Sequence, residues 1–117
     1  MEAVDIAKNA VQILDKKKAV DISMIEITEK SILSDYFVIA GGTSSTHVKS
    51  LADELEYELE KLGVTPDHIE GRATGWILLD YGSVIFHIFT KESRDFYNLE
   101  RLWADANMVD ISSLLTE

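Results

Sequence analysis

Residues 35–62 read DYFVIAGGTSSTHVKSLADELEYELEKL, and this stretch contains one complete structural unit. The segment from Asp35 to Ala40 is almost wholly apolar, which is typical of a central strand covered on both faces. Gly41 to Ser45 is a glycine turn, and Thr46 to Leu62 carries apolar side chains at helical spacing before Gly63. A strand, a glycine turn and an amphipathic helix in this order predict an α/β fold.

The N-terminal side adds one helix and one strand to this unit. Residues from about Glu2 to Lys17 place their apolar side chains on one stripe of a helix. Val20 to Ile27 largely alternates apolar and polar side chains, which indicates a strand with one buried face. With 117 residues, the chain is predicted to form one domain over residues 1–117, a mixed β-sheet with flanking helices.

The C-terminal side begins with a connection and a hairpin. Val64 to Thr74 contains the only proline and is interpreted as a connection. Two strands follow, about Trp76 to Tyr81 and Ser83 to Thr90, and a tight turn at Gly82 joins them.

A further helix is predicted after the hairpin. Ser93 or Asn98 is its expected cap, and it extends to about Ala106. The tail keeps apolar side chains at Ile111 and Leu114, which are suited to packing on the core. Four side chains of this helix form a group for which a structural role is favoured: Arg94, Tyr97, Glu100 and Trp103.

The two faces of the hairpin differ in chemistry. If its turn has two residues, one face is wholly apolar and is predicted to be core: Ile77, Leu79, Tyr81, Val84, Phe86 and Ile88. The other face is mixed: Trp76, Leu78, Asp80, Ile85, His87 and Phe89. Either a helix covers this mixed face and satisfies its polar groups, or the face is exposed and receives a partner. A three-residue turn would reverse the assignment of both faces.

The composition limits the classes of partner. The chain has 21 acidic and 11 basic residues, for a net charge of -10. Binding to RNA or DNA depends on basic side chains, so direct nucleic-acid binding is expected to be slight. The acidity suits a basic protein partner, or it serves solubility alone. The absence of cysteine, of a long apolar segment and of a basic N-terminus predicts a cytoplasmic protein that does not enter a membrane.

Catalytic and metal-binding chemistry find little support in the spacing. His87 and Asp80 are a conceivable base and orienting acid, and Ser44, Ser45 or Ser83 a conceivable nucleophile, but nothing selects any of them. No pattern of metal ligands is present, so neither a metal nor a cofactor is expected.

The Gly41 to Ser45 turn supports one alternative function. A turn between a strand and a helix offers backbone amides to a phosphate, and this one looks like the Gly-Ser turn of nucleotidyltransferases. Those enzymes need two aspartates on the following strand for metal-assisted phosphoryl transfer, whereas only Asp80 is present here. A structural connection is the favoured interpretation, and a nucleotidyltransferase-type enzyme using the turn and Asp80 is the alternative.

Taken together, these motifs resemble the ribosomal silencing factor family, also called the Iojap family. The resemblance covers nearly the whole chain. It rests on SDYFVIAGGTS at 34–44, HV at 47–48, EG at 70–71, WILLDYG at 76–82, HIF at 87–89, Arg94, FY at 96–97, LE at 99–100 and LW at 102–103.

The resemblance implies a nucleotidyltransferase-like fold without a catalytic site, in a cytosolic protein that is not an enzyme. It implies binding to a basic large-subunit ribosomal protein, number fourteen, at the subunit interface of the 50S subunit. Bound there, the protein would block joining of the small subunit and lower translation when nutrients are scarce. Family members also take part in large-subunit maturation, and several form homodimers when free.

We assign the expected partner contacts from the mixed face of the hairpin and the residues before it. Trp76 and Leu78 are the predicted apolar anchors. Glu70, Asp80 and His87 are the predicted polar contacts.

Overall fold

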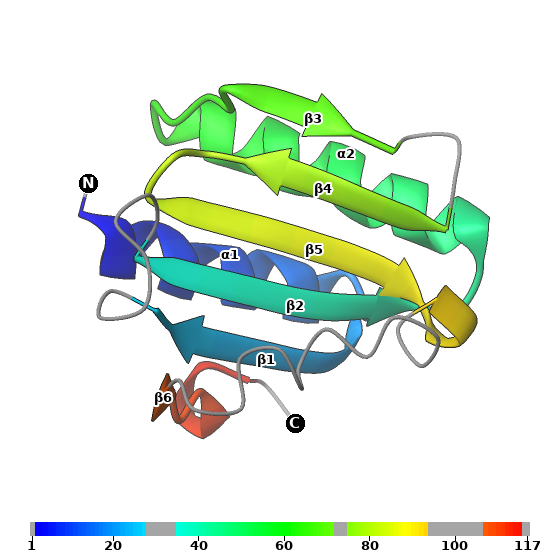
Figure 1. Cartoon of the computed structure of the whole chain (residues 1–117), viewed down its shortest axis with the longest axis horizontal. Coiled ribbons are helices and arrows are strands. Elements are labelled where there is room, and N and C mark those ends of the chain that lie inside the picture. Colours follow the sequence, from blue (N-terminus) through cyan, green and yellow to red (C-terminus); the bar gives the residue numbers. More distant parts are fainter. Residues whose placement is uncertain (1, 28–34, 72–74, 94–106, 116–117) are drawn as a thin grey trace.

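The structure is a computed structural model that describes residues 2–27, 35–71, 75–93 and 107–115. Within these ranges a six-stranded mixed sheet has the order β3-β4-β5-β2-β1-β6. The strands are β1 (Val20–Glu26), β2 (Tyr36–Gly42), β3 (His68–Glu70), β4 (Trp76–Asp80), β5 (Val84–Thr90) and β6 (Asn107–Met108). The helices α1 (Ala3–Lys16) and α2 (Ser45–Lys61) lie behind the sheet in Figure 1, and a short 3-10 helix, η1, spans Ser112–Leu114.

Strand β2 is the centre of the sheet, as its apolar sequence predicts. It pairs in parallel with β5 and antiparallel with β1. Val38 and Ala40 pack in the main core with the helices, whereas Ile39 packs on the opposite face with Phe89. An apolar residue is therefore required at every position of this stretch, because both faces of the strand are covered.

The two helices supply the other half of the main core. Ile6, Val11 and Leu14 of α1 are buried, and five residues of α2 are buried with them: Val48, Leu51, Ala52, Leu55 and Leu59. The Ser44 side chain caps α2 by accepting a hydrogen bond from the His47 N–H at 3.1 Å. Gly63 follows α2 with a φ of 84°, the left-handed conformation predicted for it.

The hairpin has the two-residue turn on which the assignment of its faces depends. The Tyr81 N–H donates to the Val84 carbonyl at 2.9 Å across Gly82 and Ser83. Leu78 pairs with His87 and Leu79 with Phe86. The face predicted to be core is buried throughout, so this prediction is confirmed: Ile77, Leu79, Tyr81, Val84, Phe86 and Ile88.

The structure differs from the sequence-based expectation in three places. The segment interpreted as a connection contains β3, which pairs with β4 at the edge of the sheet. The register of β1 shifts between Val20 and Ser23, with Asp21 at a φ of 50°, so the simple alternation expected there is interrupted. The tail adds β6 beside β1, whereas the packing of Ile111 on the core agrees with the prediction.

The start of the final helix also differs from the expected caps. Residues 91–93 are helical, and the Thr90 hydroxyl accepts a hydrogen bond from the Ser93 N–H at 3.2 Å. Thr90 therefore acts as the cap in place of Ser93, while Asn98 and the predicted helix to Ala106 lie outside the described residues. In the described part of the chain, no helix is long and apolar enough to cross a membrane.

Candidate functional site

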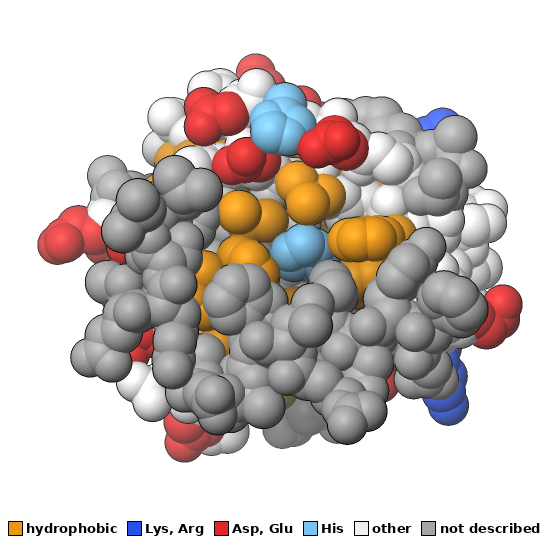
Figure 2. Space-filling view, in the orientation of Figure 1, with side chains coloured by type: hydrophobic (Ala, Val, Ile, Leu, Met, Phe, Trp, Pro, Cys, Tyr) orange, Lys and Arg blue, Asp and Glu red, His pale blue; other side chains and the backbone are white. Residues whose placement is uncertain are grey.

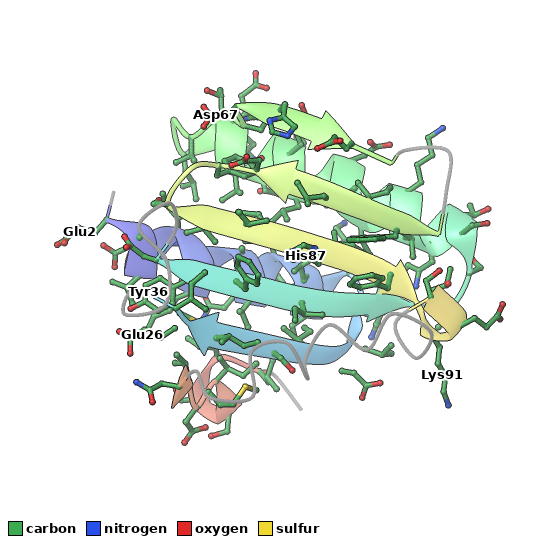
Figure 3. All side chains as sticks on the ribbon, in the orientation of Figure 1. Glu2, Glu26, Tyr36, Asp67, His87 and Lys91 are labelled. Carbon is green, nitrogen blue, oxygen red and sulfur yellow. The ribbon has the colours of Figure 1, made fainter. Side chains whose placement is uncertain are left out.

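The five predicted contact residues lie on one face of the sheet, the face turned away from α1 and α2. Glu70 pairs with Leu78, and Leu78 pairs with His87, so these three residues form one row across β3, β4 and β5. Trp76 and Asp80 lie two residues to either side of Leu78 on the same strand, and therefore on the same face. Figure 3 shows His87 in the middle of this face. We call Glu70, Trp76, Leu78, Asp80 and His87 the docking face.

The middle of the docking face is an aromatic cluster. The rings of Trp76 and Phe89 stack with centroids 5.2 Å apart and planes inclined by 23°. The Phe37 ring lies 5.1 Å from the His87 ring. The Trp76 Nε1–H donates a hydrogen bond to His87 Nδ1 at 3.3 Å. Ring packing and one hydrogen bond thus hold the indole in place.

Exposure of this face increases from its centre to its edge. Phe89 and Ile39 are fully buried, and His87 is 5% exposed. Trp76, Leu78 and Asp80 are half-buried, and Glu70 on β3 is exposed. The face is therefore neither wholly covered nor wholly open, and the accessible part lies over β3 and β4.

The burial of His87 bears on its predicted role as a direct polar contact, which stays a prediction. Its Nδ1 already accepts the hydrogen bond from Trp76, and its Nε2 has essentially no exposed surface. Burial lowers the pKa of His87 to about 4, so the imidazole is neutral near pH 7. Because Nδ1 accepts, the proton lies on Nε2, which has no hydrogen-bond partner within the described structure.

The outer edge of the docking face is acidic. His68 Nε2 lies 3.0 Å from Glu70 Oε2, and His68 Nδ1 lies 3.7 Å from Asp80 Oδ2. The other Asp80 oxygen, Oδ1, accepts the Gly82 N–H at 2.8 Å, which fixes the carboxylate at the hairpin corner. Figure 2 shows hydrophobic side chains in the middle of this face and acidic side chains along its upper edge. The strands β3, β4 and β5 contain no lysine or arginine.

A small cavity lies where the apolar and acidic parts meet. Its volume is about 270 Å³, and it is lined by Glu70, Gly71, Trp76 and Leu78. Two lining side chains are apolar and one is a carboxylate, so the cavity suits an apolar side chain that has a basic neighbour.

The alternative site, made of the Gly41–Ser45 turn and Asp80, is not assembled in the structure. Gly41 pairs with Phe89, and Phe89 pairs with Trp76, so the turn lies at the Trp76 end of β4. Asp80 is at the other end of that strand, roughly 13 Å away at the usual rise of a strand. A cavity of about 740 Å³ borders the turn, but Asp80 does not line it. The geometry therefore does not support the nucleotidyltransferase reading.

The turn itself has a structural role that centres on His47. Its Nδ1 accepts the Thr43 N–H at 2.9 Å, and its Nε2 donates to the Lys17 carbonyl at 3.0 Å. His47 thus joins the turn, the start of α2 and the end of α1. Sequence inspection gave no signal for this contact, because Lys17 lies 30 residues away along the chain.

The second group of candidate residues belongs to the predicted final helix. Arg94, Tyr97, Glu100 and Trp103 lie outside the described residues, so their favoured structural role stays a prediction. Among the described residues, no group of three or more His, Cys, Asp or Glu side chains is arranged to hold a metal ion.

Comparison with known proteins gives consistent matches along the chain. The family model described as "Ribosomal silencing factor during starvation" matches residues 1–117. Ribosomal silencing factor RsfS of Bacillus subtilis is 36% identical over 112 residues, which cover 95% of both chains. The mouse protein named mitochondrial assembly of ribosomal large subunit protein 1 is 35% identical over 97 residues, which cover 80% of this chain and 42% of the mouse protein.

Two solved structures share this fold. A crystal structure of a Chromobacterium violaceum protein matches with a TM-score of 0.86 at 32% identity, covering 89% of this chain and 88% of that one. A crystal structure of a Bacillus halodurans protein matches with a TM-score of 0.76 at 33% identity, covering 92% and 95%.

Proposed function

Because the chain belongs to the ribosomal silencing factor family, we propose that it represses translation by binding the large ribosomal subunit and blocking its association with the small subunit. The proposed contact is the basic large-subunit ribosomal protein number fourteen, at the subunit interface. The proposed mechanism is steric, since a bound 13.1 kDa protein occupies space that the small subunit needs. It requires no turnover, cofactor or metal.

The observation that supports this proposal best is the chemistry of the docking face. Partly exposed Trp76 and Leu78 adjoin the carboxylates of Glu70 and Asp80, and no lysine or arginine lies on β3, β4 or β5. A basic protein complements this face in charge, while a phosphate backbone would be repelled by it. We therefore propose contact with a ribosomal protein rather than with rRNA.

Two further elements of the proposal come from the relatives. Bacterial relatives are named ribosomal silencing factors, which supports action in the cytoplasm. The name of the mouse relative refers to assembly of the ribosomal large subunit, which supports an additional role in large-subunit maturation.

The direct test is sedimentation of ribosomal subunits with the protein present, at magnesium concentrations that favour pairing. We expect the protein to migrate with the large subunit and the fraction of paired ribosomes to decrease. Protein that stays at the top of the gradient, with pairing unchanged, would contradict the proposal. Calorimetry with nucleoside triphosphates and magnesium would then test the alternative.

Replacing Trp76 with alanine is expected to weaken binding to the large subunit by about 2 kcal/mol, roughly 30-fold, because a half-buried tryptophan at the centre of a contact is a typical hot spot. The measurement is the dissociation constant for isolated large subunits. Tyr57 is a matched control, since it is an aromatic residue 60% exposed on α2, behind the sheet. Tyr57→Ala should bind as the wild type does.

Urea unfolding of both variants is needed to interpret this result, because Trp76 also packs on Phe89. If Trp76→Ala unfolds at a much lower urea concentration and the folded fraction still binds normally, Trp76 is a core residue and not an anchor.

A further inference from the structure

We propose that His87 is a positioning residue that holds the Trp76 indole in the orientation needed for docking, and that it makes no contact with the partner itself. This inference rests on the proposed function and assigns a specific task to a buried side chain. It differs from the sequence-based expectation, in which His87 touches the partner directly.

The contacts of His87 fit this task. The hydrogen bond from Trp76 Nε1 to His87 Nδ1 joins adjacent strands, because Trp76 lies on β4 and His87 on β5. The two ring centroids are 6.1 Å apart, and the Phe37 and Phe89 rings flank His87 at 5.1 and 6.1 Å. The imidazole is thus fixed by packing and offers its one accepting nitrogen to the indole.

The other ring nitrogen of His87 adds no stabilising hydrogen bond within the described residues. Its Nε2–H is buried and finds no acceptor in the described part of the chain, and an unsatisfied buried donor costs free energy. An aliphatic side chain of similar size would fill this site without that cost. A polar group kept at such a cost is expected where function requires it.

The group that His87 holds is one wall of the small cavity on the docking face. Trp76 lines that cavity together with Glu70, Gly71 and Leu78. An indole is large and planar, so rotation about its side-chain torsions would change the shape of the cavity. The hydrogen bond to His87 restricts that rotation before the partner arrives, and such preorganisation favours binding.

Two variants of nearly equal shape separate positioning from simple packing. In His87→Asn the amide oxygen occupies the place of Nδ1 and can still accept the indole N–H. In His87→Leu the side chain has almost the same size and shape as that of asparagine, but it has no hydrogen-bond acceptor. The readouts are the dissociation constant for large subunits, the urea midpoint, and the indole N–H signal of Trp76 by NMR, assigned with Trp76→Phe.

We expect the more stable of the two variants to be the weaker binder. His87→Leu should be at least as stable as the wild type, with a displaced indole signal and affinity about fivefold lower. His87→Asn should be less stable, because its amide nitrogen enters an apolar site, yet it should keep the indole signal and bind within about twofold of the wild type.

The possible failures can be distinguished. If the wild type binds and His87→Leu binds equally well, the positioning role is wrong while the proposed function stands. If the indole signal is the same in the wild type and in His87→Leu, the hydrogen bond does not set the indole orientation and the inference is also wrong. If the wild type does not bind large subunits at all, the proposed function fails and the docking role of His87 fails with it.

Discussion

Substituting alanine for Gly42 is expected to destabilise the protein by about 3 kcal/mol, because the new methyl group has no space at the start of α2. A Cβ built at this position lies 2.8 Å from Val48 Cγ2 and 2.9 Å from the Val48 backbone nitrogen. The side chain of Val48 can rotate away, but its backbone is fixed in the first turn of the helix. The first turn of α2 would therefore have to move away from the end of β2. Because α2 carries core residues, this movement would also disturb the packing of the core.

The measurement is urea unfolding of Gly42→Ala beside two comparison proteins. Gly63→Ala has nothing within 4 Å of its new Cβ, but it is strained by a φ of 84°, so a loss of about 1 kcal/mol is expected there. Gly42→Ala combined with Val48→Ala should be less stable than Val48→Ala alone, because the clash with the backbone nitrogen remains. Equal stability of the double variant and Val48→Ala would show that only the Val48 side chain is in conflict.

Acidification is expected to lower the free energy of unfolding by about 3 kcal/mol through the protonation of His87 alone. Burial lowers its pKa from the ordinary 6.5 to about 4 in the folded state, whereas the unfolded chain keeps the ordinary value. Below about pH 6.5 the unfolded state therefore binds a proton that the folded state does not, and stability falls as the pH falls. The loss levels off below about pH 4, where the folded state also becomes protonated.

The difference between the wild type and His87→Leu isolates this effect, because the carboxylates of both proteins titrate alike. Urea unfolding at about pH 7 and about pH 4 should show a greater loss in the wild type by about 3 kcal/mol. Equal losses in the two proteins would mean that His87 is not buried in a neutral form.

The features that the sequence predicted correctly are those marked by a short repeat of apolar side chains, as in strands and amphipathic helices. The hairpin faces were predicted correctly, because alternation from Trp76 to Phe89 and a two-residue turn at Gly82 set the register without reference to other segments. The helices α1 and α2 were predicted within about one residue at each end, because their apolar stripes are long.

The features that the sequence did not predict are either very short or depend on segments distant in sequence. Strand β3 has only three residues, His68–Glu70, and is too short for alternation to be visible. Alternation predicted that His87 lies on the mixed face, but it did not predict that His87 is buried there. Burial depends on the segments that pack over that face. The separation of Asp80 from the Gly41–Ser45 turn follows from strand direction, since β4 runs antiparallel to β5, and β5 is parallel to β2.

The parallel pairing of β2 with β5 also bears on how the protein is made. Tyr36 pairs with Val84, so the middle of the sheet closes only when a long loop of chain has been brought together. Such nonlocal contacts form slowly compared with hairpins and helices. A nascent chain that still lacks β5 cannot form the central pair of strands, β2 and β5, and it has no Phe89 to stack on Trp76. We therefore expect a partly synthesised chain to be unable to engage the ribosome that is translating it, and repression to begin only after release.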